Sequence, residues 1–255
     1  MTVNMIAECG VNFSSIEEAK SMIGLAKQAG ANFVKFQLFN EDTIKDSPHF
    51  EALKALILTE EQVKELQAIA QNRRIGFILT PMYMDAVPVA AKYADLVKIR
   101  FKDRENLEMI DAVYNAGREL LISAAGRPLD PSLNYNPHMH WLYCIPSYPP
   151  QPEEMTLEIA ASMQGFSSHF PHFICDMAYV LTRNWADVYI EKHVMMDDIE
   201  ITERETISEK HQIYGFTGQT RPDPIDKAVS VTFPALAQFI KDVAVAERIR
   251  RLRLL

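Results

Sequence analysis

Short apolar runs alternate with helix-length segments along most of this chain, and this alternation restricts its fold more than any other feature. Eight runs rich in valine, isoleucine, leucine and phenylalanine have the length of strands. Helix signals lie between them, such as Ser14 and Ser15 before two glutamates, and Gly30 behind an amphipathic segment. The predicted strands are 3–9, 32–38, 75–80, 96–100, 119–123, 141–145, 165–168 and 186–191, and the predicted helices are 16–29, 59–72, 84–93, 105–116, 152–162 and 173–184.

Strands that alternate with helices indicate a parallel α/β sheet, and eight such units close naturally into a (β/α)8 TIM barrel of about 250 residues. An open doubly wound sheet is the main alternative. No glycine-rich GxGxxG or P-loop sequence follows the first strand, which favours the barrel. We predict a single barrel domain over residues 1–255, with a loop and short helix over 43–58. We also predict a long C-terminal helix at about 224–255, through which two copies of the chain could form a homodimer.

Composition excludes several classes of protein. The three cysteines, Cys9, Cys144 and Cys175, are far apart and form no CxxC pair, which argues against a disulfide framework and a zinc finger. A net charge of −8 argues against a nucleic-acid partner. No apolar run reaches the roughly 18 residues that span a bilayer, and the N-terminus lacks the basic flank of a secretory signal. We therefore expect a cytoplasmic protein without a membrane partner.

Polar residues follow or interrupt the predicted strands at the ends where a barrel carries its active site. Lys35 and Lys98 stand out, because each lies inside an otherwise apolar strand. A buried lysine must be paired or must meet an anion, so each either forms a structural salt bridge with Glu8 or Glu191 or binds a ligand. Several cations with serine and threonine hydroxyls suit a phosphate or carboxylate. The other strand-end candidates are Glu8, Gln37, Thr80, Arg100, Lys102, Asp103, Ser123, Ser147, Tyr148, Ser167, Glu191 and Lys192.

Two histidines, His169 and His193, lie 24 positions apart, each after a short apolar segment. This spacing matches one strand–helix–strand unit, so both imidazoles should project from the same end of neighbouring strands. Imidazoles in that arrangement can share a metal ion. The alternative is that each is a hydrogen-bonded core histidine, and the residues alone leave both possibilities open.

Six short motifs together resemble the sialic acid synthase family, which condenses phosphoenolpyruvate with an N-acylated hexosamine. They occur in consistent order over about residues 3–197. The motifs are Ile6–Asn12 (IAECGVN), Val34–Gln37 (VKFQ), Leu79–Pro81 (LTP), Val97–Ile99 (VKI), Gly165–His169 (GFSSH) and Ile190–His193 (IEKH).

The resemblance implies a (β/α)8 barrel, a divalent Mn²⁺ or Mg²⁺ ion and a phosphoenolpyruvate pocket. His169 and His193 would be the metal ligands. The residues expected to hold phosphoenolpyruvate are Lys35, Thr80, Lys98, Ser123 and Ser167. Tyr148 would fall on the sugar side, and Asp103 would take the place of a family carboxylate. The expected catalytic set is Glu8, Lys35, Lys98, Asp103 and Tyr148.

The chain also departs from the family pattern, mainly on the sugar side. Phe13 stands where the family has a histidine, and Ser168 stands where it has an aspartate. The segment 100–102, Arg-Phe-Lys, replaces Ala-Ser-Gly. Only Glu203 loosely stands for the sugar-binding aspartate, and we expect no C-terminal antifreeze-like domain. These changes indicate an aldehyde acceptor other than N-acetylmannosamine.

The leading hypothesis from the sequence is thus a metal-dependent synthase that condenses phosphoenolpyruvate with a sugar-type aldehyde and releases phosphate. One alternative is a catalytically degenerate barrel that binds ligands or regulates another protein. Another is a metal-dependent barrel aldolase or isomerase that ignores phosphoenolpyruvate. The degenerate barrel would bind its ligand without turnover. The aldolase or isomerase would bind a metal and a sugar phosphate.

Overall fold

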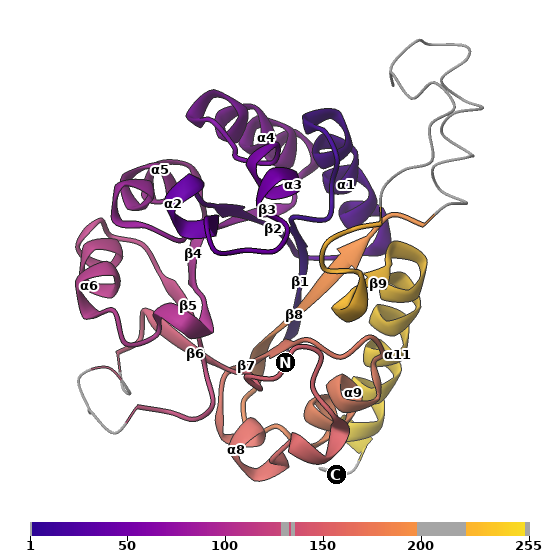
Figure 1. Cartoon of the computed structure of the whole chain (residues 1–255). Helices are drawn as coiled ribbons and strands as arrows, with labels where there is room; N and C mark the ends of the chain where they lie inside the picture. The colour runs from indigo at the N-terminus through magenta and orange to yellow at the C-terminus, as the bar shows by residue number, and fades with distance from the viewer. Residues whose placement is uncertain (1, 129–132, 134–135, 198–222, 253–255) are drawn as a thin grey trace, which may run out of the picture.

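Eight parallel strands close into a barrel in the computed structural model, which describes residues 2–128, 133, 136–197 and 223–252. Each strand pairs with its neighbours in chain order, and β1 also pairs with β8. Figure 1 shows the strands at the centre and the helices as a ring around them. The predicted (β/α)8 barrel is confirmed.

The element bounds agree closely with the expected pattern. The barrel strands are β1 (Thr2–Gly10), β2 (Phe33–Leu38), β3 (Gly76–Pro81), β4 (Leu96–Ile99), β5 (Leu120–Ala124), β6 (Met139–Tyr143), β7 (Gly165–Ser168) and β8 (Asp187–Met195). The outer helices are α1 (Ile16–Ala29), α4 (Glu60–Arg73), α5 (Val87–Tyr93), α6 (Leu107–Asn115), α8 (Leu157–Ser162), α9 (Ile174–Thr182) and α11 (Phe233–Leu252). Two short helices, α2 (Glu41–Ile44) and α3 (Phe50–Lys54), lie in the connection between β2 and α4.

Local capping explains where the first helices begin and end. The hydroxyl of Ser15 accepts a hydrogen bond from the backbone N–H of Glu18 and so caps α1. Gly30 ends that helix with φ of 93°, in the left-handed region that favours glycine. At α4, Thr59 and Gln62 form a reciprocal capping box.

The predicted C-terminal helix over 224–255 is wrong at its start, because α11 begins at Phe233. Val231 and Thr232 form instead a short strand, β9, that pairs in parallel with Val194 and Met195 of β8. β-branched residues favour extended backbone, and β8 offers them a partner because it continues to Met195. His193 therefore lies within β8 rather than at its tip.

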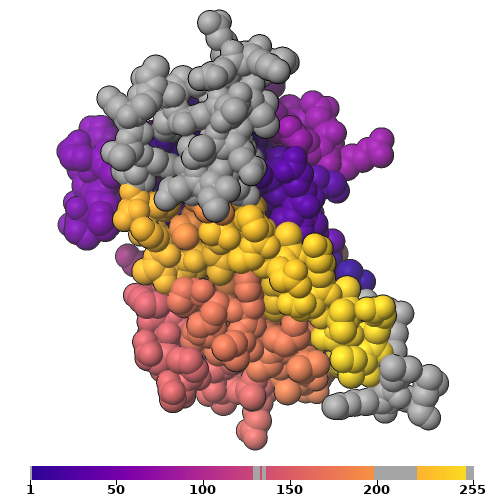
Figure 2. Space-filling view, turned by 90° about the vertical axis from the view of Figure 1, so that its right-hand side faces the viewer, coloured from indigo at the N-terminus to yellow at the C-terminus, as the bar shows by residue number. Residues whose placement is uncertain are grey.

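The helix α11 closes the ring by covering the side of the barrel where β8 pairs with β1. It packs against α1 and α9, and Figure 2 shows it lying across this face. In the described part of the chain, no helix is long and apolar enough to cross a membrane.

The barrel interior changes from apolar to polar along its axis. One layer contains buried aliphatic side chains from several strands, namely Ile6, Ile78, Leu96, Leu121 and Leu142. Side chains of a strand alternate between its two faces, so the residue two positions further along points the same way. Those residues are Glu8, Thr80, Lys98, Ser123 and Cys144. The polar end of the interior thus coincides with the carboxyl ends of the strands.

Candidate active site

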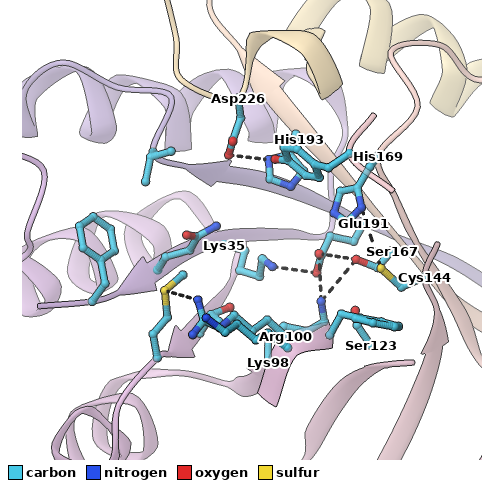
Figure 3. A pocket seen from close by; sticks show the side chains of 18 of the residues that line it. Lys35, Lys98, Arg100, Ser123, Cys144, Ser167, His169, Glu191, His193 and Asp226 are labelled. Atoms are coloured by element: carbon cyan, nitrogen blue, oxygen red, sulfur yellow. Dashed lines mark hydrogen bonds and ion pairs between the residues drawn. The ribbon is translucent and has the colours of Figure 1, made fainter. Parts of the chain in front are cut away.

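A pocket of about 450 Å³ opens at the carboxyl ends of the strands. Of the ten residues with an expected catalytic, phosphoenolpyruvate-binding or metal-binding role, eight line it: Lys35, Thr80, Lys98, Ser123, Tyr148, Ser167, His169 and His193. The strand-end candidates Gln37, Arg100 and Lys102 line it as well. Figure 3 shows the two lysines and Ser167 converging on Glu191, with the histidines above them. The structure therefore brings residues from strands β2 to β8 into one site.

The floor of the pocket is a chain of buried ion pairs centred on Glu191. Its two oxygens lie 3.0 Å from Lys98 Nζ and 3.0 Å from Lys35 Nζ. Ser167 Oγ donates a further hydrogen bond of 2.8 Å to the same carboxylate. On its other side, Lys35 Nζ lies 3.0 Å from Glu8. The salt bridges foreseen as the alternative to ligand binding are thus present, yet both lysines also face the pocket.

Burial and mutual interaction shift the pKa values of this floor. Burial, reinforced by the positive charge of Lys98 and partly offset by Glu191, lowers the pKa of Lys35 to about 7. Burial alone would raise the pKa of Glu191, but Lys35 and Lys98 outweigh it and hold that pKa below its usual range. Glu191 is therefore an ionised carboxylate at neutral pH. Lys35 changes between its charged and neutral forms near pH 7.

Hydroxyl groups complete the floor. Thr80 and Ser123 are both 1% exposed. Among the described residues, Thr80 Oγ1 has no hydrogen-bond partner. Ser123 lies beside the thiol of Cys144, and burial raises the pKa of that thiol to about 11. A buried hydroxyl without a partner costs free energy, about 1–3 kcal/mol, which a ligand oxygen would recover. The hydroxyls thus support the prediction that an oxyanion binds here.

The two histidines lie side by side at the opposite wall, as their spacing predicted. Their ring centroids are 5.3 Å apart, and the Tyr148 ring lies against both, at 4.8 Å from His169 and 6.0 Å from His193. Cys144 Sγ lies 3.9 Å from His169 Nδ1. Burial first, and then the neighbouring His193, lowers the pKa of His169 to about 3, so its imidazole is neutral.

Asp226 joins this wall and is a residue that the sequence did not predict. Its Oδ2 lies 3.2 Å from His193 Nδ1. Burial alone would raise the pKa of Asp226, but its interactions with His193 and Tyr148 outweigh burial and hold that pKa below its usual range. Its backbone N–H donates to Asn12 Oδ1 at 3.1 Å, which attaches this late segment to the end of β1. Glu203, the expected stand-in for an acceptor-binding carboxylate, lies outside the described residues.

Two predicted catalytic carboxylates do not line the pocket. Glu8 is fully buried below it, between Lys35 and Gln37, whose amide nitrogen donates to Glu8 at 2.7 Å. Asp103 pairs with the guanidinium of Arg100 at the rim. The structure therefore places Glu8 next to a lysine of the floor and Asp103 next to a pocket cation.

Two departures from the family pattern have a structural explanation. Phe13 is buried and packs edge-on against Phe36, with ring centroids 6.0 Å apart, so it belongs to the core. Ser168 faces the helix layer, where Lys192 Nζ donates to its Oγ at 3.0 Å and also lies 2.9 Å from Asp176. Neither residue lines the pocket.

Glu191 was foreseen as a strand-end residue and a salt-bridge partner but was given no binding or catalytic role, although it organises the floor. A usable signal was present, because Glu191 and His193 lie two positions apart in one strand and therefore share a face. Asp226 had no comparable signal, since it follows a long polar segment and reaches the pocket through Asn12.

The fold and this pocket define a (β/α)8 barrel with a floor of buried lysines and hydroxyls and a histidine pair. Comparison with known proteins gives the family. The NeuB family model matches residues 22–212, and the chain belongs to the NeuB family.

The N-acetylneuraminate-9-phosphate synthase of Mus musculus is 28% identical over 227 residues, covering 76% of this chain and 62% of that protein. The N,N'-diacetyllegionaminic acid synthase of Campylobacter jejuni is 25% identical over 228 residues, covering 76% of this chain and 67% of that protein. The chain thus spans less than two thirds of the mouse enzyme.

Solved structures confirm the fold. The N-acetylneuraminic acid synthetase of Leptospira borgpetersenii superposes with a TM-score of 0.73 at 22% identity, covering 99% of this chain and 85% of that one.

Proposed function

We propose that this protein condenses phosphoenolpyruvate with a sugar-type aldehyde and releases inorganic phosphate. The observation that carries the proposal is the floor, where two buried lysines and the hydroxyls of Thr80, Ser123 and Ser167 face one cavity. Cations and hydroxyls in a buried cavity suit a ligand with both a phosphate and a carboxylate. The similarity to synthases that make related acids supports this assignment.

The histidine pair fits a divalent cation in part. Both imidazoles lie in one wall, and burial keeps His169 unprotonated, as a metal ligand must be. Among the described residues, no group of three histidine, cysteine, aspartate or glutamate side chains could hold an ion. His169 and His193 would therefore bind Mn²⁺ or Mg²⁺ together with water or substrate oxygens. When bound, such an ion polarises a carbonyl and orients water.

The proposed reaction forms one carbon–carbon bond and releases phosphate. C3 of phosphoenolpyruvate forms a bond to the aldehyde carbon while the oxygen of a water molecule adds to C2. The bond between C2 and the phosphate oxygen then breaks, which leaves a 2-oxo acid and inorganic phosphate. One proton of the water ends on the new hydroxyl group and the other on phosphate.

The chain's own residues have distinct parts in this scheme. Lys35 and Lys98 hold the anionic groups and offset their charge as phosphate leaves. Lys35 has a pKa of about 7, so it can also exchange a proton near neutral pH. Glu8, 3.0 Å from Lys35, keeps this lysine in place and can accept that proton. Tyr148 and Asp226 line the wall where the aldehyde would lie.

The test is phosphate release from phosphoenolpyruvate with a panel of aldoses, in Mn²⁺, in Mg²⁺ and in chelator. We expect release that requires both phosphoenolpyruvate and an aldose. Tight binding of phosphoenolpyruvate without turnover would indicate a ligand-binding or regulatory barrel instead. Turnover of a sugar phosphate with no dependence on phosphoenolpyruvate would indicate an aldolase or isomerase. Either result would overturn the proposal.

A further inference from the structure

One wall of the pocket, beyond the polar floor, is largely apolar. It is formed by side chains that follow β1 to β4 and by the short helices α2 and α3. These are Val11, Phe39, Ile44, Leu53, Met82 and Phe101. Leu53 and Ile44 reach the pocket because α2 and α3 lie in the connection after β2.

Two polar side chains on this side, Thr43 and Gln37, already have partners within the protein. The Thr43 hydroxyl donates to Asn40 O at 2.8 Å and accepts from Asn40 N at 3.0 Å, as part of the cap of α2. The Gln37 amide nitrogen donates to Glu8 at 2.7 Å. Hydroxyl groups of a bound sugar would therefore find few partners along this wall, and a buried hydroxyl without a partner weakens binding.

The cations of the rim offer little to a second anionic group. The Arg100 guanidinium pairs with Asp103, and its Nη1 donates to Met82 Sδ at 3.1 Å. Lys102 is exposed to solvent, where an ion pair contributes little. Among the residues that the structure describes, a phosphate at the far end of the acceptor would thus meet no buried cation that lacks a carboxylate partner.

Apolar surface continues beyond the pocket. A second hollow of about 220 Å³ shares Val11 and Ile225 with it, and its other apolar walls include Phe13, Leu56 and Pro224. The two hollows share part of their lining, so the apolar surface beside the pocket is larger than a methyl group requires.

We propose that the aldehyde acceptor carries an apolar group larger than acetyl, such as a medium-length acyl or alkyl chain, which packs against Ile44 and Leu53. This inference rests on the proposed condensation, since that reaction places an aldehyde in the pocket. Each methylene buried against the wall should raise kcat/KM roughly fourfold.

The test uses mannosamine carrying N-acetyl, N-butanoyl or N-hexanoyl groups, with mannose and arabinose 5-phosphate as comparisons. Phosphate release from phosphoenolpyruvate gives kcat/KM for each sugar. We expect the value to rise from acetyl to hexanoyl and arabinose 5-phosphate to be the poorer substrate. A flat or falling series, or a preference for the phosphorylated sugar, would overturn the inference while leaving the condensation itself established.

Binding of the corresponding alditols, which lack the aldehyde and cannot react, tests the inference without turnover. Calorimetry should show that the N-hexanoyl alditol binds more tightly than the N-acetyl alditol, and equal affinity would overturn the proposal. If no aldose releases phosphate but the longer alditol binds more tightly, the proposed condensation fails and the apolar subsite stands.

A matched pair of variants locates the subsite. Leu53→Gln places a polar amide in the wall at similar size and should remove the preference for the longer chain in both assays. Leu53→Met keeps the wall apolar and should retain that preference. Circular dichroism checks that both variants fold. A preference that survives Leu53→Gln would show that the chain lies elsewhere.

Discussion

Replacing Lys98 by methionine separates a ligand-binding lysine from a purely structural one. Lys98 is 2% exposed, and its Nζ lies 3.0 Å from Glu191 and 3.5 Å from Ser167 Oγ. Methionine keeps most of the volume and removes the charge. If Lys98 binds phosphoenolpyruvate, the variant must lose affinity for that anion.

The contacts of Lys98 set the expected changes in the affinity for phosphoenolpyruvate and in stability. A hydrogen bond from a charged group contributes about 1.5–3 kcal/mol, so the Kd for phosphoenolpyruvate should rise about 10- to 150-fold. Glu191 retains Lys35 at 3.0 Å and the Ser167 hydroxyl at 2.8 Å, so its carboxylate keeps partners. We therefore expect a loss of stability below the roughly 3–5 kcal/mol that follows when a buried charge loses its partner.

Lys192 provides the matched control, because it is a buried lysine that faces away from the pocket. Its Nζ lies 2.9 Å from Asp176 and donates to His172 O at 2.7 Å. Lys192→Met leaves the fully buried Asp176 carboxylate without that cation, which should cost about 3–5 kcal/mol. The melting temperature should fall by roughly 6–20 °C, with a change in phosphoenolpyruvate Kd of less than about threefold.

Isothermal titration calorimetry gives the Kd values, and thermal and urea unfolding give the stabilities. An unchanged Kd for phosphoenolpyruvate in Lys98→Met would refute the reasoning and make Lys98 a structural residue like Lys192. Equal losses of affinity in both variants would also refute it, since the effect would then come from the fold rather than from the pocket.

Thr80, His193 and Lys35 test further parts of the same geometry. Thr80→Val removes a hydroxyl that has no partner among the described residues, so stability should hold or rise by up to about 1 kcal/mol while the Kd for phosphoenolpyruvate increases; a large loss of stability would contradict this. His193→Ala should weaken Mn²⁺ binding in calorimetry at least about tenfold, and unchanged affinity would count against the histidine pair as a metal site. Burial lowers the pKa of Lys35 from 10.5 to about 7, so the affinity for phosphoenolpyruvate should fall as pH rises through 7, and this fall should be absent in Lys35→Met. Because the unfolded chain binds the additional proton between pH 7 and about 10.5, the contribution of Lys35 to the free energy of unfolding should rise with pH over that window.

The sequence predicted the barrel because strand and helix signals alternate along the chain. It predicted most of the pocket for a related reason. Lys35, Lys98 and the two histidines lie in or directly after strands, and parallel strands bring such positions to one end of the sheet. Local sequence was sufficient to predict a pocket residue wherever the strand that carries the residue sets its position.

The features that were missed depend on contacts between distant segments. Asp226 reaches the pocket through a hydrogen bond to Asn12, which is far away in the chain. The start of α11 depends on the pairing of Val231 with Val194. This pairing keeps Val231 and Thr232 extended, although the sequence pattern predicts a helix there. Local propensity contains no information about either partner.

The most direct test of the central claim is the fate of the oxygen atom during turnover in ¹⁸O-labelled water. The condensation breaks the bond between C2 and the bridging oxygen, so the released phosphate should contain no ¹⁸O and should form in equal amount to a 2-oxo acid. Phosphate that carries ¹⁸O would show hydrolysis at phosphorus, and phosphate that forms without an aldehyde would show hydrolysis of phosphoenolpyruvate alone. Either result would contradict the proposed function.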